Sequence, residues 1–343
     1  MQHDLVIRRR VNVLPALVMV ASFAACDRPV TAPNTPSTAS AAKGGAAGNG
    51  GGGALPDQYV IAPIPTSAVF PEGIAYEQRT QNVFVSSTTN GTIYRGDASD
   101  ETLTPFLPPG GDGRTFAAGL EVDDAGHLFV AGGGTGFVFV YDAISGALVA
   151  KLSGGSSPTF LNDIAVDNDG VAYVTDSQSP VIYRVVPNGA GGYTLERWLT
   201  LTGTPIVYQA GFNLNGIVVS PNNRYLYTVQ SNTGKLFRIE IATKEIVELD
   251  TGGALFPNGD GLWMHGSSLY VLQNQQELIT ELRVQQNQAD ATVVSRTTDP
   301  SFMYPTSLVG ARGRLLVVNS QFDKRAPGMT PVLPFTVSVV KVP

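Results

Sequence analysis

The sequence predicts an all-β fold, a six-bladed β-propeller, and three observations support this prediction. A short phrase recurs six times, with its leading residues 46, 44, 53, 45 and 46 positions apart. Short runs rich in Val, Ile, Tyr and Phe follow each copy and are separated by turn signals. Gly (38) and Pro (23) are abundant, while charged residues make up only 15% of the chain. A period of about 45 residues with several strands per repeat is typical of a propeller.

The recurring phrase consists of a polar or small residue, a second such residue, and then Ile or Leu. Its copies are Glu72-Gly73-Ile74, Ala118-Gly119-Leu120, Asn162-Asp163-Ile164, Asn215-Gly216-Ile217, Asp260-Gly261-Leu262 and Thr306-Ser307-Leu308. Each copy is expected to open the innermost strand of one blade. The first residues would then lie at the same height around a single central axis.

Three strands are predicted in each repeat by runs of β-forming residues. In the first three repeats they cover 70–78, 82–88 and 91–97; 117–124, 127–133 and 137–143; 161–168, 171–177 and 181–187. In the last three they cover 214–221, 225–231 and 235–241; 259–266, 268–274 and 278–284; 305–311, 314–320 and 335–342. Asn90-Gly91 is a strong hairpin signal between two of these strands. Fourth strands are less distinct, although Leu195–Leu201 and Lys244–Asp250 fit.

Ring closure requires a further strand, because only three strands are predicted in the last repeat before Pro343. Residues 58–62 precede the first repeat and have no other partner. We predict that this N-terminal segment closes the last blade as its outer strand, which removes an exposed sheet edge. The propeller would therefore span residues 57–343.

Residues 1–25 are predicted to be a signal peptide. Arginines at positions 8 to 10 precede an apolar stretch that is short for a membrane span. The sequence Phe23-Ala24-Ala25-Cys26 is similar to a bacterial lipobox, which makes Cys26 the lipidated mature N-terminus. The alternative is ordinary cleavage near Ala24 or Ala25. These two hypotheses predict a periplasmic or cell-surface lipoprotein and a secreted soluble protein, respectively.

Residues 26–56 pass from Pro, Ser and Thr into Gly and Ala, and they offer little apolar surface. Such a composition predicts a flexible tether, which would hold the globular part off a membrane reached by the lipid anchor only. The formal net charge of −6 argues against nucleic acid as a partner, because phosphate binding needs clustered Lys and Arg. The sequence does not predict an oligomeric state.

Four of the six leading residues carry oxygen donors, and they form the candidate metal site. Glu72, Asn162, Asn215 and Asp260 provide an all-oxygen set with a formal charge of −2. Such a set suits a hard divalent cation, best Ca²⁺. Zn²⁺ or Mn²⁺ are alternatives, although the set contains no thiolate or imidazole. The structural alternative is that these residues only cap strand starts.

The interval of 53 residues between Asn162 and Asn215 contains a probable loop over 203–212. We expect this loop near the channel mouth, where Tyr208 and Phe212 are candidate substrate contacts. A longer surface loop without function is the equal alternative.

From about Phe70 to Val342, the chain resembles the regucalcin/gluconolactonase family of six-bladed propellers, also called SMP-30 or LRE-like. The resemblance rests on FPEGIAY around Glu72, FLNDIAVD around Asn162, Asn215-Gly216-Ile217 and Asp260-Gly261-Leu262. It implies that Glu72, Asn215 and Asp260 bind a divalent metal and that Asn162 lies at or beside it. Some lactonases of the family carry an Arg where this chain has Phe160, so Phe160 implies a more apolar substrate than a sugar lactone.

The resemblance implies a metal-dependent hydrolase of lactones or related esters, with a small-molecule substrate and Asp260 as the catalytic residue. The cation would polarise the carbonyl, and Asp260 would activate the nucleophile. No Ser-His-Asp arrangement with a nucleophile elbow competes with this hypothesis. The alternatives are a non-catalytic propeller that binds a ligand or protein, and strictosidine-synthase-like chemistry that uses a channel carboxylate without metal.

Overall fold

The computed structural model describes residues 53–62, 68–110, 112–154, 158–285 and 289–343. The predicted signal peptide (1–25), Cys26 and the tether up to residue 52 lie outside the described residues. Within the described part, no helix is long and apolar enough to cross a membrane.

Twenty-four strands and one short 3₁₀ helix make up the regular structure of the described residues. The first three repeats contain β2 (Pro71–Glu77), β3 (Asn82–Ser87), β4 (Ile93–Asp97) and β5 (Thr102–Leu107); β6 (Leu120–Val122), β7 (His127–Ala131), β8 (Phe137–Asp142) and β9 (Leu148–Ser153); β10 (Leu161–Val166), β11 (Ala172–Asp176), β12 (Val181–Pro187) and β13 (Tyr193–Thr200). The last three contain β14 (Leu214–Val219), β15 (Tyr225–Gln230), β16 (Lys235–Glu240) and β17 (Ile246–Glu248); β18 (Gly259–His265), β19 (Ser268–Gln273), β20 (Leu278–Val284) and β21 (Ala291–Thr297); β22 (Pro305–Ala311), β23 (Arg314–Asn319), η1 (Phe322–Lys324) and β24 (Thr336–Lys341).

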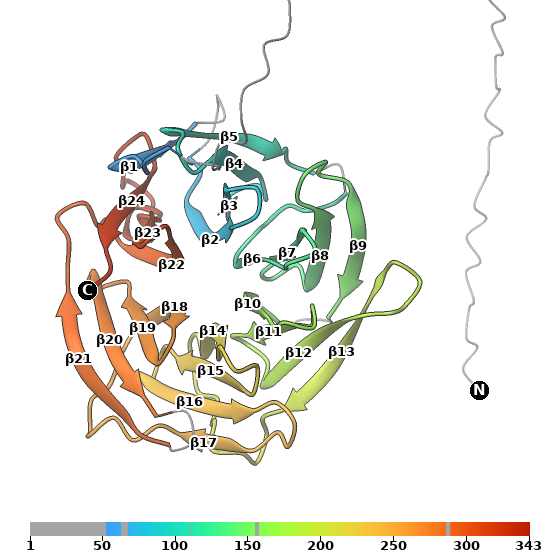
Figure 1. Cartoon of the computed structure of the whole chain (residues 1–343), viewed down its shortest axis with the longest axis vertical. Helices are drawn as coiled ribbons and strands as arrows, with labels where there is room; N and C mark the ends of the chain where they lie inside the picture. Colours follow the sequence, from blue (N-terminus) through green and yellow to red (C-terminus); the bar gives the residue numbers. More distant parts are fainter. Residues whose placement is uncertain (1–52, 63–67, 111, 155–157, 286–288) are drawn as a thin grey trace, which may run out of the picture. The chain divides into compact units, whose positions relative to one another are not determined.

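Consecutive strands of each repeat pair antiparallel, so the prediction of an all-β fold is confirmed. Four sheets contain four strands each. A further sheet of eight strands has the order β2-β3-β4-β5-β1-β24-β23-β22, in which β1 (Gln58–Ile61) is antiparallel to β24 and parallel to β5. The sheets are arranged around a centre that the first strands of the repeats face, as Figure 1 shows for β2, β6, β10, β14, β18 and β22.

The hydrophobic core lies between neighbouring sheets. Among the described residues, buried apolar side chains form six clusters, and each cluster draws on two repeats that are adjacent around the centre. One of them joins Tyr59 of β1 and Val337 of β24 to Val83 of β3 and Tyr94 of β4. The start and the end of the described chain therefore share one core, which stabilises the ring by apolar burial.

The outermost strands differ from the pattern that identifies the inner ones. β13 and β17 overlap the two predicted fourth strands, whereas β5, β9 and β21 occur where no run of β-forming residues was singled out. Most residues of β9 are exposed or only partly buried. An outer strand with so little buried surface has no need of alternating apolar residues, which explains the weak sequence signal.

Candidate functional site

The four predicted site residues all stand at irregular positions in the first strands of their repeats. The pairing of β2 with β3 shifts register between Pro71 and Ile74, which places Glu72 in the shift. The same shift occurs around Asn162 in β10, Asn215 in β14 and Asp260 in β18. A bulge of this kind re-aims one side chain without ending the strand. The recurring phrase in the sequence is therefore the signature of a repeated bulge.

The residue after each site residue lies against the next sheet. A Cβ atom on Gly216 would clash with the backbone carbonyl oxygen of Asp260, and one on Gly73 would clash with that of Ala118. Glycine is required at these two positions because backbone from the neighbouring repeat occupies the space of a side chain. This close contact between first strands holds the site residues near one another.

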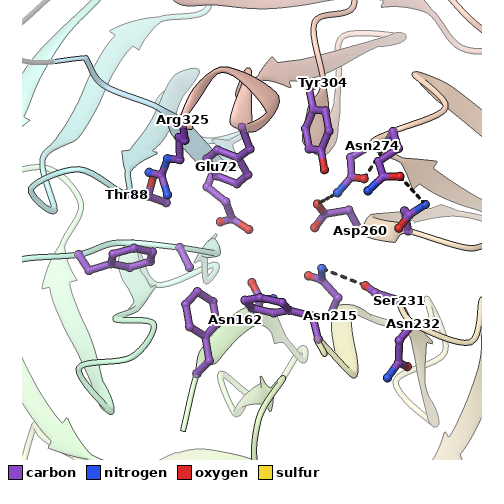
Figure 2. Close-up of a pocket in the computed structure, with 17 residues that line it drawn as sticks. Glu72, Thr88, Asn162, Asn215, Ser231, Asn232, Asp260, Asn274, Tyr304 and Arg325 are labelled. Atoms are coloured by element: carbon purple, nitrogen blue, oxygen red, sulfur yellow. Dashed lines mark hydrogen bonds between the residues drawn. The ribbon is translucent and has the colours of Figure 1, made fainter. Parts of the chain in front are cut away.

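The bulges bring the site residues to one cavity of about 470 Å³. Figure 2 shows Glu72, Asn162, Asn215 and Asp260 around its centre. All four are buried, with at most 8% of their surface exposed. Residues that are up to 188 positions apart in the sequence thus form one polar cluster in a cavity of the size that small ligands occupy.

Each of three site residues is oriented by a polar side chain directly after the second strand of its own repeat. Asn162 donates to the Ser177 hydroxyl over 2.9 Å, and Asn215 donates to the Ser231 hydroxyl over 3.2 Å. Asp260 accepts from the Asn274 amide over 2.8 Å. The two asparagine bonds use the amide nitrogen and leave the carbonyl oxygen of each asparagine for a ligand.

Glu72 departs from this scheme. The equivalent residue in its repeat, Thr88, donates instead to the Phe70 carbonyl and accepts from Arg325. As a result, Oε2 of Glu72 has no hydrogen-bond partner, and the same is true of Oδ1 of Asn162. A buried polar atom without a partner costs roughly 1–3 kcal/mol, so two such oxygens in one cavity point to a ligand that both would bind.

Burial also raises the pKa of both carboxyl groups. Burial raises the pKa of Glu72 well above its ordinary range, and the nearby Asp260 and Asp163 carboxylates add to this effect. Burial raises the pKa of Asp260 to about 7, against the opposing hydrogen bonds of Asn274 and Asn215. A positive charge between these side chains would reverse both shifts, because it favours the ionised form of each carboxyl group.

The donor set fits a hard divalent cation. It consists of two carboxylates and two amides, all of which offer oxygen, and two of the oxygens lack partners. Within the described residues, no three His, Cys, Asp or Glu side chains gather closely enough to form a metal site by themselves. Any cation in this cavity would therefore depend on the two asparagines as well as the two acids, an arrangement that Ca²⁺ accepts readily.

Two of the three predicted substrate contacts lie on the cavity wall. Phe160 and Phe212 line the cavity together with Phe116. The ring centroid of Phe160 lies 5.6 Å from that of Phe116 and 5.0 Å from that of Phe212, and both pairs of rings meet edge to face. The three rings form one apolar surface, which we call the phenylalanine wall.

Tyr208, the third predicted substrate contact, lies away from this cavity wall. It is not among the residues that line the cavity. Its hydroxyl donates to the backbone carbonyl of Asp176, and its ring packs on the core between the third and fourth repeats. The loop reaches the cavity through Phe212, whereas Tyr208 attaches the loop to the core of the third and fourth repeats.

Several lining residues were not predicted from the sequence. They include Thr88, Phe116, Tyr304, Phe322 and Arg325. Ser231 also lines the cavity, and together with Ser177 it shares one position of the repeats with Asn274, so an alignment of the repeats to one another would have revealed both serines. Phe322 and Arg325 lie in residues 320–335, a long connection between β23 and β24 that has no counterpart in the other repeats. An insertion in one repeat often lies on the binding face, so the extra length of this connection could have indicated that its residues reach the site.

Comparisons with known proteins agree with this architecture. The family described as "SMP-30/Gluconolactonase/LRE-like region" matches residues 70–249. A protein of Staphylococcus haemolyticus named "Lactonase drp35" is 22% identical over 174 residues, which make up 50% of each chain. The chain thus matches about half the length of this curated relative.

Solved structures show the same fold at low sequence identity. The allergen Mala s 1 of Malassezia sympodialis superimposes with a TM-score of 0.59 at 16% identity, over 84% of this chain and 97% of that one. A gluconolactonase of Xanthomonas campestris gives a TM-score of 0.55 at 17% identity, over 74% and 84% of the two chains. At such identities, these similarities show a β-propeller fold and nothing further.

Proposed function

Because the chain belongs to the SMP-30/gluconolactonase/LRE-like family, we propose that it is a hydrolase of lactones or related esters that depends on a divalent cation. The observation that carries this proposal is the pair of buried oxygens without partners, Glu72 Oε2 and Asn162 Oδ1, in one cavity with Asp260. The names of the Staphylococcus and Xanthomonas proteins support a lactone as the substrate. The size of the cavity supports a small molecule.

Glu72, Asn162, Asn215 and Asp260 would hold the cation, with Ca²⁺ favoured because every donor is oxygen. Zn²⁺ and Mn²⁺ are the alternatives. When bound, the cation would supply Lewis-acid polarisation of the ester carbonyl and stabilisation of the charge that develops on its oxygen.

Asp260 is the proposed catalytic residue. A bound cation would keep the carboxyl group of Asp260 ionised, as a general base must be, and Asn274 holds one of its oxygens. Asp260 would take a proton from the attacking water as the water oxygen bonds to the carbonyl carbon. It would return this proton to the alkoxide oxygen when the ester bond breaks. The phenylalanine wall would exclude bulk water from the bound ester.

The test is hydrolysis of a panel of sugar, aliphatic and aromatic lactones by the purified protein with Ca²⁺, Mn²⁺, Zn²⁺ or EDTA. We expect turnover that EDTA abolishes, and a loss of at least about 100-fold in Asp260→Asn. Asp124→Asn, an exposed turn substitution of the same kind, should retain full activity. Cation binding without turnover of any lactone would instead favour the ligand-binding propeller.

For the fold, we propose six blades, with β1 completing the sixth around β22, β23 and β24. The pairing of β1 with β24 and the core shared by the first and last repeats support this ring. The hydrogen bond from Thr306 to the Glu72 carbonyl, 2.9 Å long, also links the sixth first strand to the first.

For the N-terminal part, we propose that residues 1–25 direct export, that Cys26 is lipidated, and that residues 26–56 tether the propeller to a membrane. The sequence alone supports this arrangement and the periplasmic or cell-surface location that it implies. Incorporation of labelled fatty acid into the wild type but not into Cys26→Ser would support lipidation. Equal labelling of both proteins would contradict it.

A further inference from the structure

Arg325 brings a positive charge to the mouth of an otherwise acidic and apolar cavity. It caps η1 in the long connection between β23 and β24. Figure 2 shows its side chain beside Thr88 and Glu72. Among the described residues that line the cavity, Arg325 is the one cation. The residue remains partly exposed, so a ligand that enters the cavity can reach it.

The guanidinium of Arg325 is held in place without an anionic partner. It lies over the rings of Phe70 and Phe322, 4.8 Å and 4.5 Å from their centroids, and it donates to the Thr88 hydroxyl. The ion pairs found among the described residues do not include Arg325. Aromatic contacts fix the orientation of an arginine while leaving most of its five N–H donors available.

The neighbouring Glu72 does not form an ion pair with Arg325. Glu72 and Arg325 influence each other electrostatically, yet no ion pair within 4.0 Å joins them. Oε2 of Glu72 also lacks any hydrogen bond. The two charges therefore face the cavity separately, as two subsites of opposite sign.

The phenylalanine wall is a third part of the same cavity. Its outermost ring, Phe212, is 45% exposed. An exposed aromatic ring at a cavity mouth is suited to packing on an apolar ligand. A molecule in the cavity would thus meet the carboxylates and amides of the predicted metal site, an apolar surface, and a fixed guanidinium.

We propose that Arg325 determines specificity for substrates that carry a carboxylate group beside an apolar ring or chain. The guanidinium would pair with the carboxylate, and the phenylalanine wall would pack on the apolar part. A planar carboxylate accepts two parallel hydrogen bonds from an arginine fork, and it carries one negative charge to match one cation. A phosphate dianion fits less well, because it would bring more charge close to Glu72 and Asp260. The claim about substrates rests on the proposed hydrolase function, whereas the carboxylate subsite does not.

The first test measures binding without turnover. The probes are 3-phenylpropionate and its neutral amide, titrated calorimetrically into EDTA-treated full-length protein, so that no cation competes for the carboxylate. We expect the wild type to bind the acid at least about tenfold more tightly than the amide, as for other charge-assisted pairs. Arg325→Met, which keeps the apolar stem over the two rings, should lose this preference and bind the amide as before.

Two further variants control for charge and geometry. Arg325→Lys keeps the charge but not the fork, and it should retain only part of the preference. Arg314→Met removes an exposed arginine of β23 that does not line this cavity, and it should retain the full preference. Equal binding of acid and amide by the wild type would overturn the proposal. Equal weakening of both probes in Arg325→Met would do the same, because it would show a structural role.

The second test measures turnover of 3,4-dihydrocoumarin and a carboxy-substituted derivative by the cation-loaded protein. We expect Arg325→Met to lower kcat/KM for the acid at least about tenfold and to leave that for the neutral lactone unchanged. If neither lactone is hydrolysed while the wild type still prefers the acid probe, the hydrolase proposal fails and the carboxylate subsite stands. An equal fall for both lactones in Arg325→Met would overturn the specificity role.

Discussion

At the scale of single residues, the site depends on how each oxygen of the four candidate ligands is bonded. Ser177, Ser231 and Asn274 each fix one side chain of the site and leave other oxygens free. Glu72 lacks such a partner, because Thr88 is bonded to Phe70 and Arg325. Of the four buried side-chain oxygens without a partner in the described residues, two are the hydroxyls of Tyr94 and Tyr227 and lie elsewhere. The other two, on Glu72 and Asn162, face one cavity, which is the physical basis for placing a cation there.

The raised pKa of Asp260 predicts that cation binding depends on pH. The pKa of Asp260 is about 7 in the folded, cation-free protein, so its carboxyl group is mostly protonated below pH 7. A cation that binds there must displace this proton. We expect Ca²⁺ affinity to rise between pH 5.5 and 7 by about tenfold per pH unit for each proton displaced, and Glu72, whose pKa is also raised, contributes to this rise. Calorimetry in two buffers of different ionisation enthalpy should show proton release at pH 6.

The raised pKa of Asp260 also determines how this carboxyl group changes the free energy of unfolding with pH. A carboxyl group whose pKa is higher in the folded state than in the unfolded state stabilises the fold at low pH. This contribution is fully present below the ordinary pKa of 3.8, falls by about 1.4 kcal/mol per pH unit as pH rises above it, and is lost once pH exceeds about 7. Asp260→Asn should therefore be more stable than the cation-free wild type at pH 8, but not at pH 4. Ca²⁺ affinity that is equal at pH 5.5 and 7.5 would contradict the raised pKa of Asp260, on which both predictions rest.

At the scale of elements, the bulged first strands carry both the site and the contacts between sheets. Where the other phrases have a small residue, the third has Asp163, whose carboxylate accepts from the backbone N–H groups of Ile164 and Ile217. The bond to Ile217 joins β10 to β14, so an acid here links two sheets. Gly216 performs the equivalent task by close contact with Asp260.

Gly216→Ala is predicted to damage fold and site together. Its Cβ would clash with the Asp260 carbonyl, which belongs to a bulged strand and cannot move independently. We expect a loss of about 2–3 kcal/mol in the free energy of unfolding by urea, along with weakened Ca²⁺ binding. Gly134→Ala is the matched control, because its Cβ would meet nothing nearer than 3.9 Å. Equal stability of the two variants would contradict the role assigned to the close contact.

The sequence predicted the features that repeat, and it missed those that occur once. Glu72, Asn162, Asn215 and Asp260 could be found because a bulge at a fixed register recurs in five of the six repeats. Arg325 could not, since it lies in an insertion that obeys no period. Tyr208 is not among the residues that line the cavity, and a loop sequence does not show which way a side chain points. Phe212, four residues later in the same loop, reaches the cavity.

At the scale of the whole molecule, the proposed ring would make distant segments depend on one another. β1 pairs with β24 across nearly the whole described chain, and Tyr59 of β1 is fully buried. Its hydroxyl donates to the Ala98 carbonyl over 2.7 Å, next to the first sheet. One short strand thus contacts both the first and the last repeat.

Tyr59→Ala is predicted to destabilise the whole ring. We expect a loss of about 3–5 kcal/mol, as for other buried aromatic truncations, in a single cooperative transition. Tyr59→Phe should lose only about 1 kcal/mol, the value of the hydroxyl hydrogen bond. Leu148→Ala in the outer strand β9, where the side chain is 44% exposed, should have a small effect. If Tyr59→Ala were no more harmful than Leu148→Ala, β1 would not close the ring.

The central claim is that the leading residues of four of the six repeats converge on one divalent cation. The most direct measurement is a calorimetric titration of EDTA-treated wild type, Glu72→Gln and Glu101→Gln with Ca²⁺ at pH 7.5. The account predicts about one ion per chain for the wild type and for Glu101→Gln, whose altered side chain is exposed, and no saturable binding for Glu72→Gln. No binding by the wild type, or unchanged binding by Glu72→Gln, would contradict it.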